Sequence, residues 1–361
     1  MCAICGIFNL TNGEKIEKHI LENMLRVVLH RGPDGSDILM MDNIALGFNR
    51  LSFIDLDSGM QPIWNEDKTI SMICNGEIFN FQTLCAEMKE KGHFFRTKTD
   101  IEVILHLYEE YGLDFPSRLN GQFAIALYDY KKKQLLLVRD QIGIAPLFYT
   151  ISNGKLIFAS EIKAILQYPG VNKKLNLKAL DQLMNYPGVV SPTTFFEGIY
   201  SLRGGHMLCC KSNQELKDIE YWDLVYQTQE FDKGESYYIE KLRELLKNAI
   251  ARRLVADVPI GFYISGGLDS SMVACFIGLY MMNSYYSFSA EMESEELDES
   301  QFQKTICECV QSTHYSVRIT EETLWENLGQ VIYHAESGLK ESYDVAAYLL
   351  SALVKNSPAK A

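Results

Sequence analysis

The chain has 361 residues, of which 47% are hydrophobic and 22% are charged, and its formal net charge is −13. This length suffices for two domains with separate cores, and an acidic surface repels nucleic acid and anionic lipid, so we expect neither as a partner. No apolar run is long enough to span a bilayer, and the start MCAICGIFNLTNGEK has no basic region or cleavage site. We therefore predict no membrane span and no signal peptide.

Residues 1–165 alternate short β-rich runs with turn residues, which is typical of hairpins. The predicted strands are ICGIFNL, IALGFNRLSFIDL, TISMICNGEIFN, GQFAIALYDY, KQLLLVRD and LFYT. Apolar residues at helical spacing predict helices over 14–31 and 100–112. Strands with two interspersed helices indicate a layered α+β domain.

The second half of the chain has a different pattern, which begins after an irregular region at 170–230. An amphipathic helix is predicted over 236–254, and the continuous apolar strand VPIGFYI follows it. Helices and apolar strands then alternate as far as HYSVRIT. This alternation predicts a doubly wound α/β domain with a parallel sheet.

The nine cysteines are an odd number, and the one CxxC spacing among them, Cys2 and Cys5, is not accompanied by an ordered set of further Cys or His ligands. This pattern favours free thiols in a reducing, cytoplasmic setting over disulfides or a metal site. Cys2 differs from the others because removal of Met1 would give it a free α-amine. A neutral amine beside the thiol can act as its general base, so the two form a candidate nucleophile–base pair. Cys5 has no such amine, and we expect it to be structural.

Residues farther along the first half could complete such a site. The side-chain N–H of Asn75 and the backbone N–H of Gly76 are candidates for an oxyanion hole, since glycine allows close approach of a ligand. Arg50 can hold an α-carboxylate through two hydrogen bonds, whereas Glu77 and Asp100 can hold an α-ammonium. Together these groups are the two halves of an amino-acid clamp.

The segment SGGLDSS, from Ser265 to Ser271, lies between an apolar strand and a helix. Gly266 and Gly267 let backbone N–H groups converge on an anion, and Ser265 and Ser270 add hydroxyl groups. Asp269 would repel phosphate unless Mg²⁺ lies between them. The loop lacks the lysine of the GxxxxGK[ST] motif, which disfavours transfer of a γ-phosphoryl group.

The first half resembles the glutaminase domain of class II glutamine amidotransferases. The motifs that carry this resemblance are MCAICG, RGPDG, NRLSFID, NGEIFNF, TKTDIEVI, GQFAIALYD, VRDQIGIAPLFY and FASEIKAI. The resemblance implies an αββα fold of the N-terminal-nucleophile hydrolase type, with Cys2 as the nucleophile. It also implies a role for each clamp residue, with glutamine bound by Arg50, Asn75, Gly76, Glu77 and Asp100. One departure is Ala3, where the family usually has glycine.

The phrase VPIGFYISGGLDSS resembles the pyrophosphate loop of ATP pyrophosphatases. Together with the first half, it makes the chain similar to the asparagine synthetase (glutamine-hydrolysing) family. That resemblance implies that Cys2 forms a thioester with glutamine and releases ammonia, which passes through a tunnel. ATP then converts aspartate to a β-aspartyl adenylate, and ammonia gives asparagine, AMP and pyrophosphate.

The resemblance also implies a domain organisation and a nucleotide site. We expect a glutaminase domain over 1–205, a connector over 206–232 and an ATP-pyrophosphatase domain over 233–361. The expected contacts of ATP are Ile264, Ser265, Gly266, Gly267, Asp269, Ser270 and Ala290, with Asp269 as the ligand of Mg²⁺. Glutamine, aspartate and ATP are the expected partners, and a homodimer is possible by analogy with the family.

The family's synthetase domain carries a second motif of the form SGxGxDE, which this sequence lacks before it ends in YLLSALVKNSPAKA. We therefore expect a second domain that is incomplete at its C-terminal end. Three alternatives to an asparagine synthetase remain open at this point. They are the same chemistry on another carboxylate in a biosynthetic pathway, a homologue that keeps only glutaminase activity, and a non-catalytic binding protein.

Overall fold

The computed structural model describes residues 1–11, 15–213, 215–226, 231–280, 285–294 and 296–360. Contacts within the chain divide it into two units, Met1–Val225 and Tyr226–Ala361. In the part of the chain that the structure describes, no helix has both the length and the apolar character needed to cross a membrane. All nine cysteines lie in the described ranges, and each is a free thiol.

Two antiparallel sheets of six strands each form the framework of the first unit. The first sheet has the order β10-β8-β9-β1-β3-β2, with bounds Tyr200–Ser201, Phe148–Ser152, Lys155–Ala159, Ala3–Asn9, Ile44–Arg50 and Gly35–Met40. The second sheet has the order β12-β11-β7-β6-β5-β4, with bounds Lys217–Glu220, His206–Lys211, Gln134–Arg139, Gly121–Asp129, Ile70–Ile78 and Ile63–Trp64.

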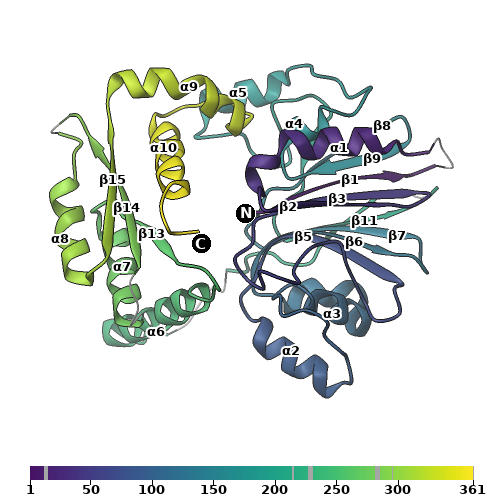
Figure 1. Cartoon of the computed structure of the whole chain (residues 1–361), viewed down its shortest axis with the longest axis horizontal. Helices are drawn as coiled ribbons and strands as arrows, with labels where there is room; N and C mark the ends of the chain where they lie inside the picture. The colour runs from purple at the N-terminus through teal and green to yellow at the C-terminus, as the bar shows by residue number, and fades with distance from the viewer. Residues whose placement is uncertain (12–14, 214, 227–230, 281–284, 295, 361) are drawn as a thin grey trace. The chain divides into compact units, whose positions relative to one another are not determined.

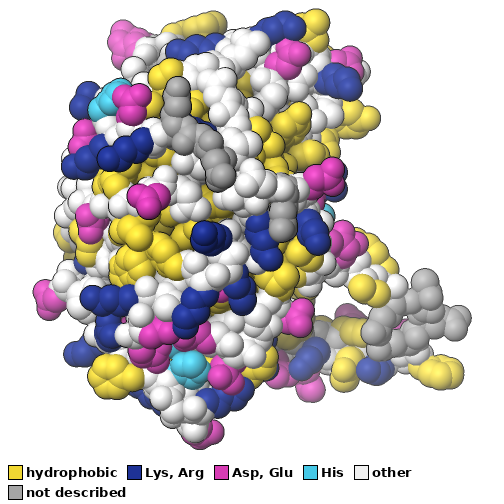
Figure 2. Space-filling model, turned by 90° about the vertical axis from the view of Figure 1, so that its right-hand side faces the viewer, with side chains coloured by type: hydrophobic (Ala, Val, Ile, Leu, Met, Phe, Trp, Pro, Cys, Tyr) yellow, Lys and Arg dark blue, Asp and Glu magenta, His cyan; other side chains and the backbone are white. Residues whose placement is uncertain are grey.

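Helices cover the outer face of each sheet, so the first unit has four layers (Figure 1). The first sheet is covered by α1 (Lys18–Val27) and α4 (Ile162–Ile165). The second sheet is covered by α2 (Phe81–Glu90) and α3 (Val103–Tyr111), and α3 continues into the 3₁₀ helix Gly112–Arg118. This arrangement confirms the predicted αββα sandwich. Acidic and basic side chains are interspersed on the side of the molecule that Figure 2 shows.

Alternation along β1 separates two buried faces of the first sheet. Ile4 and Phe8 belong to the core between the two sheets. Cys5 and Ile7 point the other way and pack with Met24 in the core beneath α1. Successive side chains of a strand point to opposite faces, so even-numbered residues at the start of this strand face the second sheet.

The observed elements differ from the predicted ones at several boundaries. The helix predicted over 14–31 is α1 followed by a 3₁₀ turn at Leu29–Arg31, and α2 was not predicted at all. The range assigned to a connector, 206–232, contains β11 and β12. β11 pairs with β7, because the apolar run Met207–Cys210 packs in the cores on the two faces of the second sheet, and β12 pairs with β11.

The second unit contains a parallel sheet with the order β13-β14-β15. Its strands span Gly261–Tyr263, Tyr286–Met292 and Thr313–Ile319. The helices are α6 to α10, with bounds Glu235–Arg253, Leu268–Tyr280, Ser300–Val310, Glu321–Ala335 and Tyr343–Lys355. Because α8 and α10 pack on opposite faces of the sheet (Figure 1), the predicted α/β architecture with a parallel sheet is confirmed. The remaining helix, α5, spans Leu177–Asn185 in the first unit.

Candidate functional site

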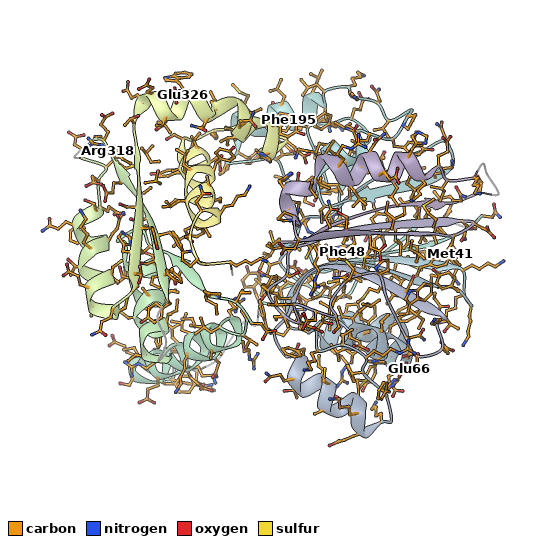
Figure 3. All side chains as sticks on the ribbon, viewed as in Figure 1. Met41, Phe48, Glu66, Phe195, Arg318 and Glu326 are labelled. Atoms are coloured by element: carbon orange, nitrogen blue, oxygen red, sulfur yellow. The ribbon has the colours of Figure 1, made fainter. Side chains whose placement is uncertain are left out.

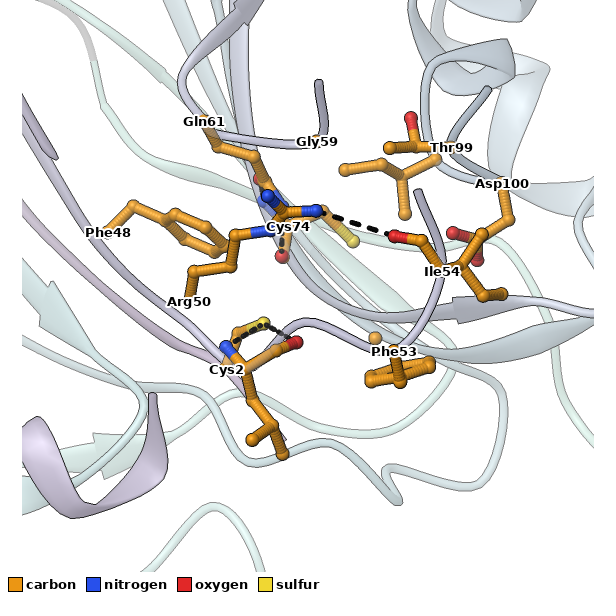
Figure 4. A pocket seen from close by; sticks show the side chains of 13 residues that line it. Cys2, Phe48, Arg50, Phe53, Ile54, Gly59, Gln61, Cys74, Thr99 and Asp100 are labelled. Atoms are coloured by element: carbon orange, nitrogen blue, oxygen red, sulfur yellow. Dashed lines mark hydrogen bonds between the residues drawn. The ribbon is translucent and has the colours of Figure 1, made fainter. Parts of the chain in front are cut away.

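Cys2 lies directly before β1, at the edge of the core between the two sheets. Its thiol sulfur accepts a hydrogen bond from the Leu51 N–H at 3.4 Å, and it also lies 3.6 Å from the Leu51 carbonyl oxygen (Figure 4). The Cys2 carbonyl accepts a hydrogen bond from Arg31 Nε at 3.0 Å, and Arg31 in turn pairs with Glu161 at 3.1 Å. This buried ion pair therefore helps to fix the start of the chain.

Burial affects the protonation of both groups at this end of the chain. It raises the pKa of the Cys2 thiol, although the charges of Arg50 and Arg31 oppose the change. Burial also lowers the pKa of the α-ammonium group, which belongs to Met1 in this structure. Both shifts favour the neutral forms of the amine and the thiol. These are the forms that a base and a nucleophile need before the proton is transferred between them.

Cys5 is fully buried on the opposite face of β1, where it packs beneath α1. Burial raises the pKa of its thiol far above the ordinary value, so it remains a neutral thiol. The two cysteines near the amino terminus are thus in different environments, and only Cys2 lines the pocket of Figure 4.

Arg50 ends β3 and lies in the same pocket as Cys2. Its guanidinium group donates hydrogen bonds to the carbonyl groups of Ile54 at 3.4 Å, Leu56 at 3.2 Å and Asp55. Among the described residues, no carboxylate forms an ion pair with Arg50, which is only 6% exposed. A buried guanidinium group whose hydrogen-bond acceptors are backbone carbonyl groups is suited to binding an anionic ligand.

Asp100 lines the pocket together with Cys2 and Arg50. It accepts a hydrogen bond from the Ile78 N–H at 2.7 Å. Burial, assisted by the charge of Glu77, raises the pKa of Asp100 to about 7. Glu77 itself accepts a hydrogen bond from Gln122 at 3.4 Å and does not line the pocket.

Asn75 is fully buried on β5, and neither its amide nitrogen nor its amide oxygen has a hydrogen-bond partner among the described residues. It lies two positions after Ile73, which belongs to the core between the sheets, so alternation places Asn75 on the face towards β1. Such an unpaired buried amide calls for an explanation, and a ligand is one.

Gly76 lines the pocket, and its hydrogen atom faces the neighbouring strand. A Cβ atom at this position would lie 2.1 Å from the carbonyl oxygen of Gln122 on β6. Packing between the strands therefore requires glycine here. The sequence predicted a different reason for this glycine, namely access for a ligand.

Several pocket residues were not predicted from the sequence. Phe53, Gly59, Gln61 and Thr99 come from segments that connect strands and helices. Gln61 is held by the backbone of Cys74, to whose carbonyl it donates at 3.1 Å. A Cβ atom on Gly59 would lie 2.3 Å from Arg50 Nη2, so only glycine leaves room for that guanidinium group.

The glycine-rich loop of the second unit connects β13 with α7, as the sequence predicts. Gly266 has a φ of +90°, a conformation that favours glycine. Ser265 Oγ accepts a hydrogen bond from the Gly267 N–H at 3.2 Å and lies 2.9 Å from Ser270 Oγ. Ile264, just before the loop, is buried and donates its N–H to Phe288.

Gln303 on α8, which the sequence did not point to, links two parts of this region. Its side-chain nitrogen donates to the carbonyl groups of Ser265 at 3.2 Å and Ala290 at 3.1 Å. The side chain is 3% exposed. It therefore brings the predicted nucleotide contact on β14, Ala290, close to the glycine-rich loop.

Asp269 lies in the first turn of α7 and so at the loop's helical end. Within the described residues, no group of three or more potential metal ligands includes it. A single protein carboxylate suits Mg²⁺, which usually takes its other ligands from phosphate oxygens and water. The residues present thus fit a Mg²⁺–nucleotide complex, for which Asp269 is a candidate ligand.

Two family models match the chain. The model described as a glutamine amidotransferase domain matches residues 1–222, and the model described as asparagine synthase matches residues 241–361. Together they cover both candidate sites.

Three curated relatives illustrate the similarity. Asparagine synthetase [glutamine-hydrolyzing] 2 of Bacillus subtilis is 39% identical over 76% of this chain and 38% of its own length. Amidase chry2 of Gibberella zeae is 41% identical over 70% of this chain and 38% of its own length. Asparagine synthetase [glutamine-hydrolyzing] 3 of Bacillus subtilis is 31% identical over 92% of this chain and 56% of its own length. The chain thus spans between 38% and 56% of the length of these relatives.

Proposed function

The chain belongs to the glutamine amidotransferase family, and we propose that it hydrolyses glutamine at Cys2 and supplies ammonia for the ATP-dependent amidation of aspartate. The products of the complete reaction are asparagine, glutamate, AMP and pyrophosphate. The observation that carries the first step is the presence of Cys2, Arg50 and Asp100 in one pocket.

Recognition of glutamine follows from the charges in this pocket. Arg50 binds the α-carboxylate, because its guanidinium group is buried and its hydrogen-bond acceptors are the backbone carbonyl groups of Ile54, Asp55 and Leu56. Asp100 binds the α-ammonium group, with Glu77 as a second carboxylate nearby. The side-chain amide of glutamine then lies towards Cys2.

The reaction starts when the α-amine of Cys2, freed by removal of Met1, takes the proton of the thiol. The sulfur attacks the amide carbon, and the resulting oxyanion accepts hydrogen bonds from Asn75 Nδ2 and the Gly76 N–H. The amine then gives its proton to the nitrogen that leaves as ammonia. A water molecule hydrolyses the thioester to glutamate and restores the thiol.

The second unit binds ATP at the loop between β13 and α7. We infer the same contacts as from the sequence, which are Ile264, Ser265, Gly266, Gly267, Asp269, Ser270 and Ala290 on or beside this loop. Backbone N–H groups at the start of α7 favour an anion, and Asp269 would hold Mg²⁺. ATP, when bound, would turn one carboxylate oxygen of the substrate into part of a good leaving group, because the carbon of a free carboxylate is a poor electrophile. The free thiols support a reducing compartment such as the cytoplasm for both reactions, and a homodimer stays a prediction.

The identity of the carboxylate is tested separately. ATP–pyrophosphate exchange is measured with aspartate and with a panel of other carboxylic acids. Exchange that depends on aspartate supports the asparagine synthetase assignment. Exchange with another acid, and none with aspartate, would replace it with the same chemistry on that acid.

The glutaminase assignment is tested with two cysteine variants. Cys2→Ala is expected to abolish the release of glutamate from glutamine and to spare any ammonia-dependent amidation. Cys5→Ser is the matched control, because Cys5 lies on the same strand but faces the α1 layer. If Cys5→Ser loses glutaminase activity while Cys2→Ala keeps it, the assignment of the nucleophile is wrong.

A further inference from the structure

Two histidines and two glutamates meet beneath the helical layer of the second sheet, outside the pocket that contains Cys2. We call them the α3 cluster, and its members are Glu66, His93, His106 and Glu109. His106 and Glu109 lie on α3, His93 lies in the segment between α2 and α3, and Glu66 lies in the turn between β4 and β5. Figure 3 shows Glu66 at the edge of this layer.

The four side chains direct their ligand atoms towards one point. His93 Nδ1 lies 3.6 Å from Glu66 Oε1 and 3.7 Å from Glu109 Oε2. His106 Nδ1 lies 3.6 Å and 3.3 Å from the same two oxygens. The edge of a tetrahedron of ligands around zinc is about 3.3 Å, given metal–ligand bonds of about 2.0–2.1 Å. These four N···O separations equal or slightly exceed that edge, and all four ligand atoms lie within 4.8 Å of one another.

The outer nitrogen of each histidine faces a further carboxylate. His93 Nε2 lies within hydrogen-bond distance of Glu110, at 3.3 Å, whereas His106 Nε2 lies 3.9 Å from Glu102 and makes no hydrogen bond. Histidine ligands of metals usually donate their second N–H to a carboxylate or carbonyl group, which orients the ring. In addition, Asn65 donates to the second oxygen of Glu109 at 2.7 Å and so holds that carboxylate in place.

The charges of this region call for a cation at its centre. Four carboxylates surround the two imidazoles. Among the described residues, Lys91 is the one lysine or arginine that forms an ion pair with any of these carboxylates, and it pairs with Glu110. A divalent cation between the two imidazoles and the carboxylates would offset this negative charge.

We propose that the α3 cluster is a binding site for a four-coordinate divalent cation, of which Zn²⁺ matches the ligand set and the separations best. Mixed imidazole and carboxylate ligands suit zinc, whereas Mg²⁺ and Ca²⁺ prefer oxygen alone. His106 is 1% exposed and Glu66 is 34% exposed, so the site has a rigid inner side and an open outer side for entry of the ion.

The ion would join three segments that are separate in the sequence. These are the turn with Glu66, the segment with His93, and α3. The chain between His93 and α3 includes Thr99 and Asp100, which line the pocket with Cys2. The site therefore has a structural role, in which it holds the segment that carries Asp100, and it does not depend on the proposed function.

The test uses the full chain, stripped of metal with a chelator and then titrated with Zn²⁺ or Co²⁺. We expect one tightly bound Zn²⁺ per chain by elemental analysis and a higher melting temperature with Zn²⁺ than with chelator. Bound Co²⁺ should give the intense visible absorption of a tetrahedral site, without the near-ultraviolet band of a cobalt–thiolate bond. The absence of that thiolate band separates the α3 cluster from the nine cysteines.

Variants then locate the site. His93→Gln and Glu109→Gln should each weaken Zn²⁺ binding at least tenfold. The control is His206→Gln, since His206 also lies between two carboxylates, Asp218 and Glu220, but outside the cluster. No bound Zn²⁺, a thiolate band, or equal affinity in all three variants would overturn the proposal. If a variant fails to fold, the Co²⁺ spectrum of the unmodified chain still decides.

Discussion

Asp100 should make glutamine binding depend on pH near neutrality. Its pKa, raised by burial to about 7, means that the carboxyl is neutral below that pH and cannot pair with an ammonium group. The affinity of Cys2→Ala protein for glutamine, measured by calorimetry, should therefore fall as the pH decreases through 7, by up to about tenfold per unit.

The control for this prediction is Asp100→Asn, which removes the titrating group and keeps the shape of the side chain. Its affinity for glutamine should be low and nearly constant between pH 6 and 8, a range chosen around the pKa of about 7. A pH dependence that is equal in both proteins would show that another group titrates.

Arg50 should be poorly replaced by lysine, even though the charge is kept. Its guanidinium group donates to three backbone carbonyls and leaves N–H groups for a ligand, whereas lysine has one compact ammonium group. Arg50→Lys should raise the KM for glutamine on the order of 10- to 100-fold, with a smaller effect on kcat. A normal KM in steady-state kinetics would contradict the role of Arg50.

The sequence predicted the polar centre of this pocket better than its walls. Cys2, Arg50 and Asp100 stand in recognisable motifs, and the structure brings them into one pocket. Phe53 and Thr99 lie in irregular segments, whose paths depend on distant contacts that local patterns do not encode.

Close packing between β5 and β6 should make Gly76 intolerant of any side chain. Because a Cβ atom would meet the Gln122 carbonyl oxygen at 2.1 Å, Gly76→Ala should destabilise the first unit by about 1–3 kcal/mol. Gly188→Ala is the control, since no atom lies within 4 Å of a Cβ atom there. Equal midpoints of urea denaturation for the two variants would show that the strands can separate at this point.

Helix α8 should contribute to nucleotide binding through Gln303. This side chain links the backbone of Ser265 with that of Ala290, so Gln303→Ala should loosen the loop and weaken ATP binding about tenfold. Gln301→Ala provides the comparison, because Gln301 is exposed on the same helix. If Gln303→Ala and Gln301→Ala bind ATP with similar affinity in a fluorescence titration, Gln303 does not contribute to nucleotide binding.

Elements with strong periodicity were predicted well, and short or weakly patterned ones were not. The runs that become β5, β6, α6 and β14 stand out in the sequence because apolar residues repeat along them. In contrast, β12 has four residues, Lys217–Glu220, three of them charged, and it forms because β11 offers a free edge for pairing.

The chain as a whole combines two units whose motifs point to different chemistry. The resemblance predicted both architectures, because each unit carries a recognisable motif beside a strand. The amino-terminal cysteine lies directly before β1, and the glycine-rich loop follows β13. The α3 cluster was not predicted, since its four ligands come from three separate segments. Only the folded arrangement shows that they meet.

The central claim is that the sulfur and the α-amine of Cys2 act together on the glutamine amide. The most direct test compares glutamine hydrolysis by protein that has lost Met1 with hydrolysis by protein that retains it, each defined by intact mass. The account predicts that the rate is proportional to the fraction that lacks Met1. Equal rates for the two forms would contradict it.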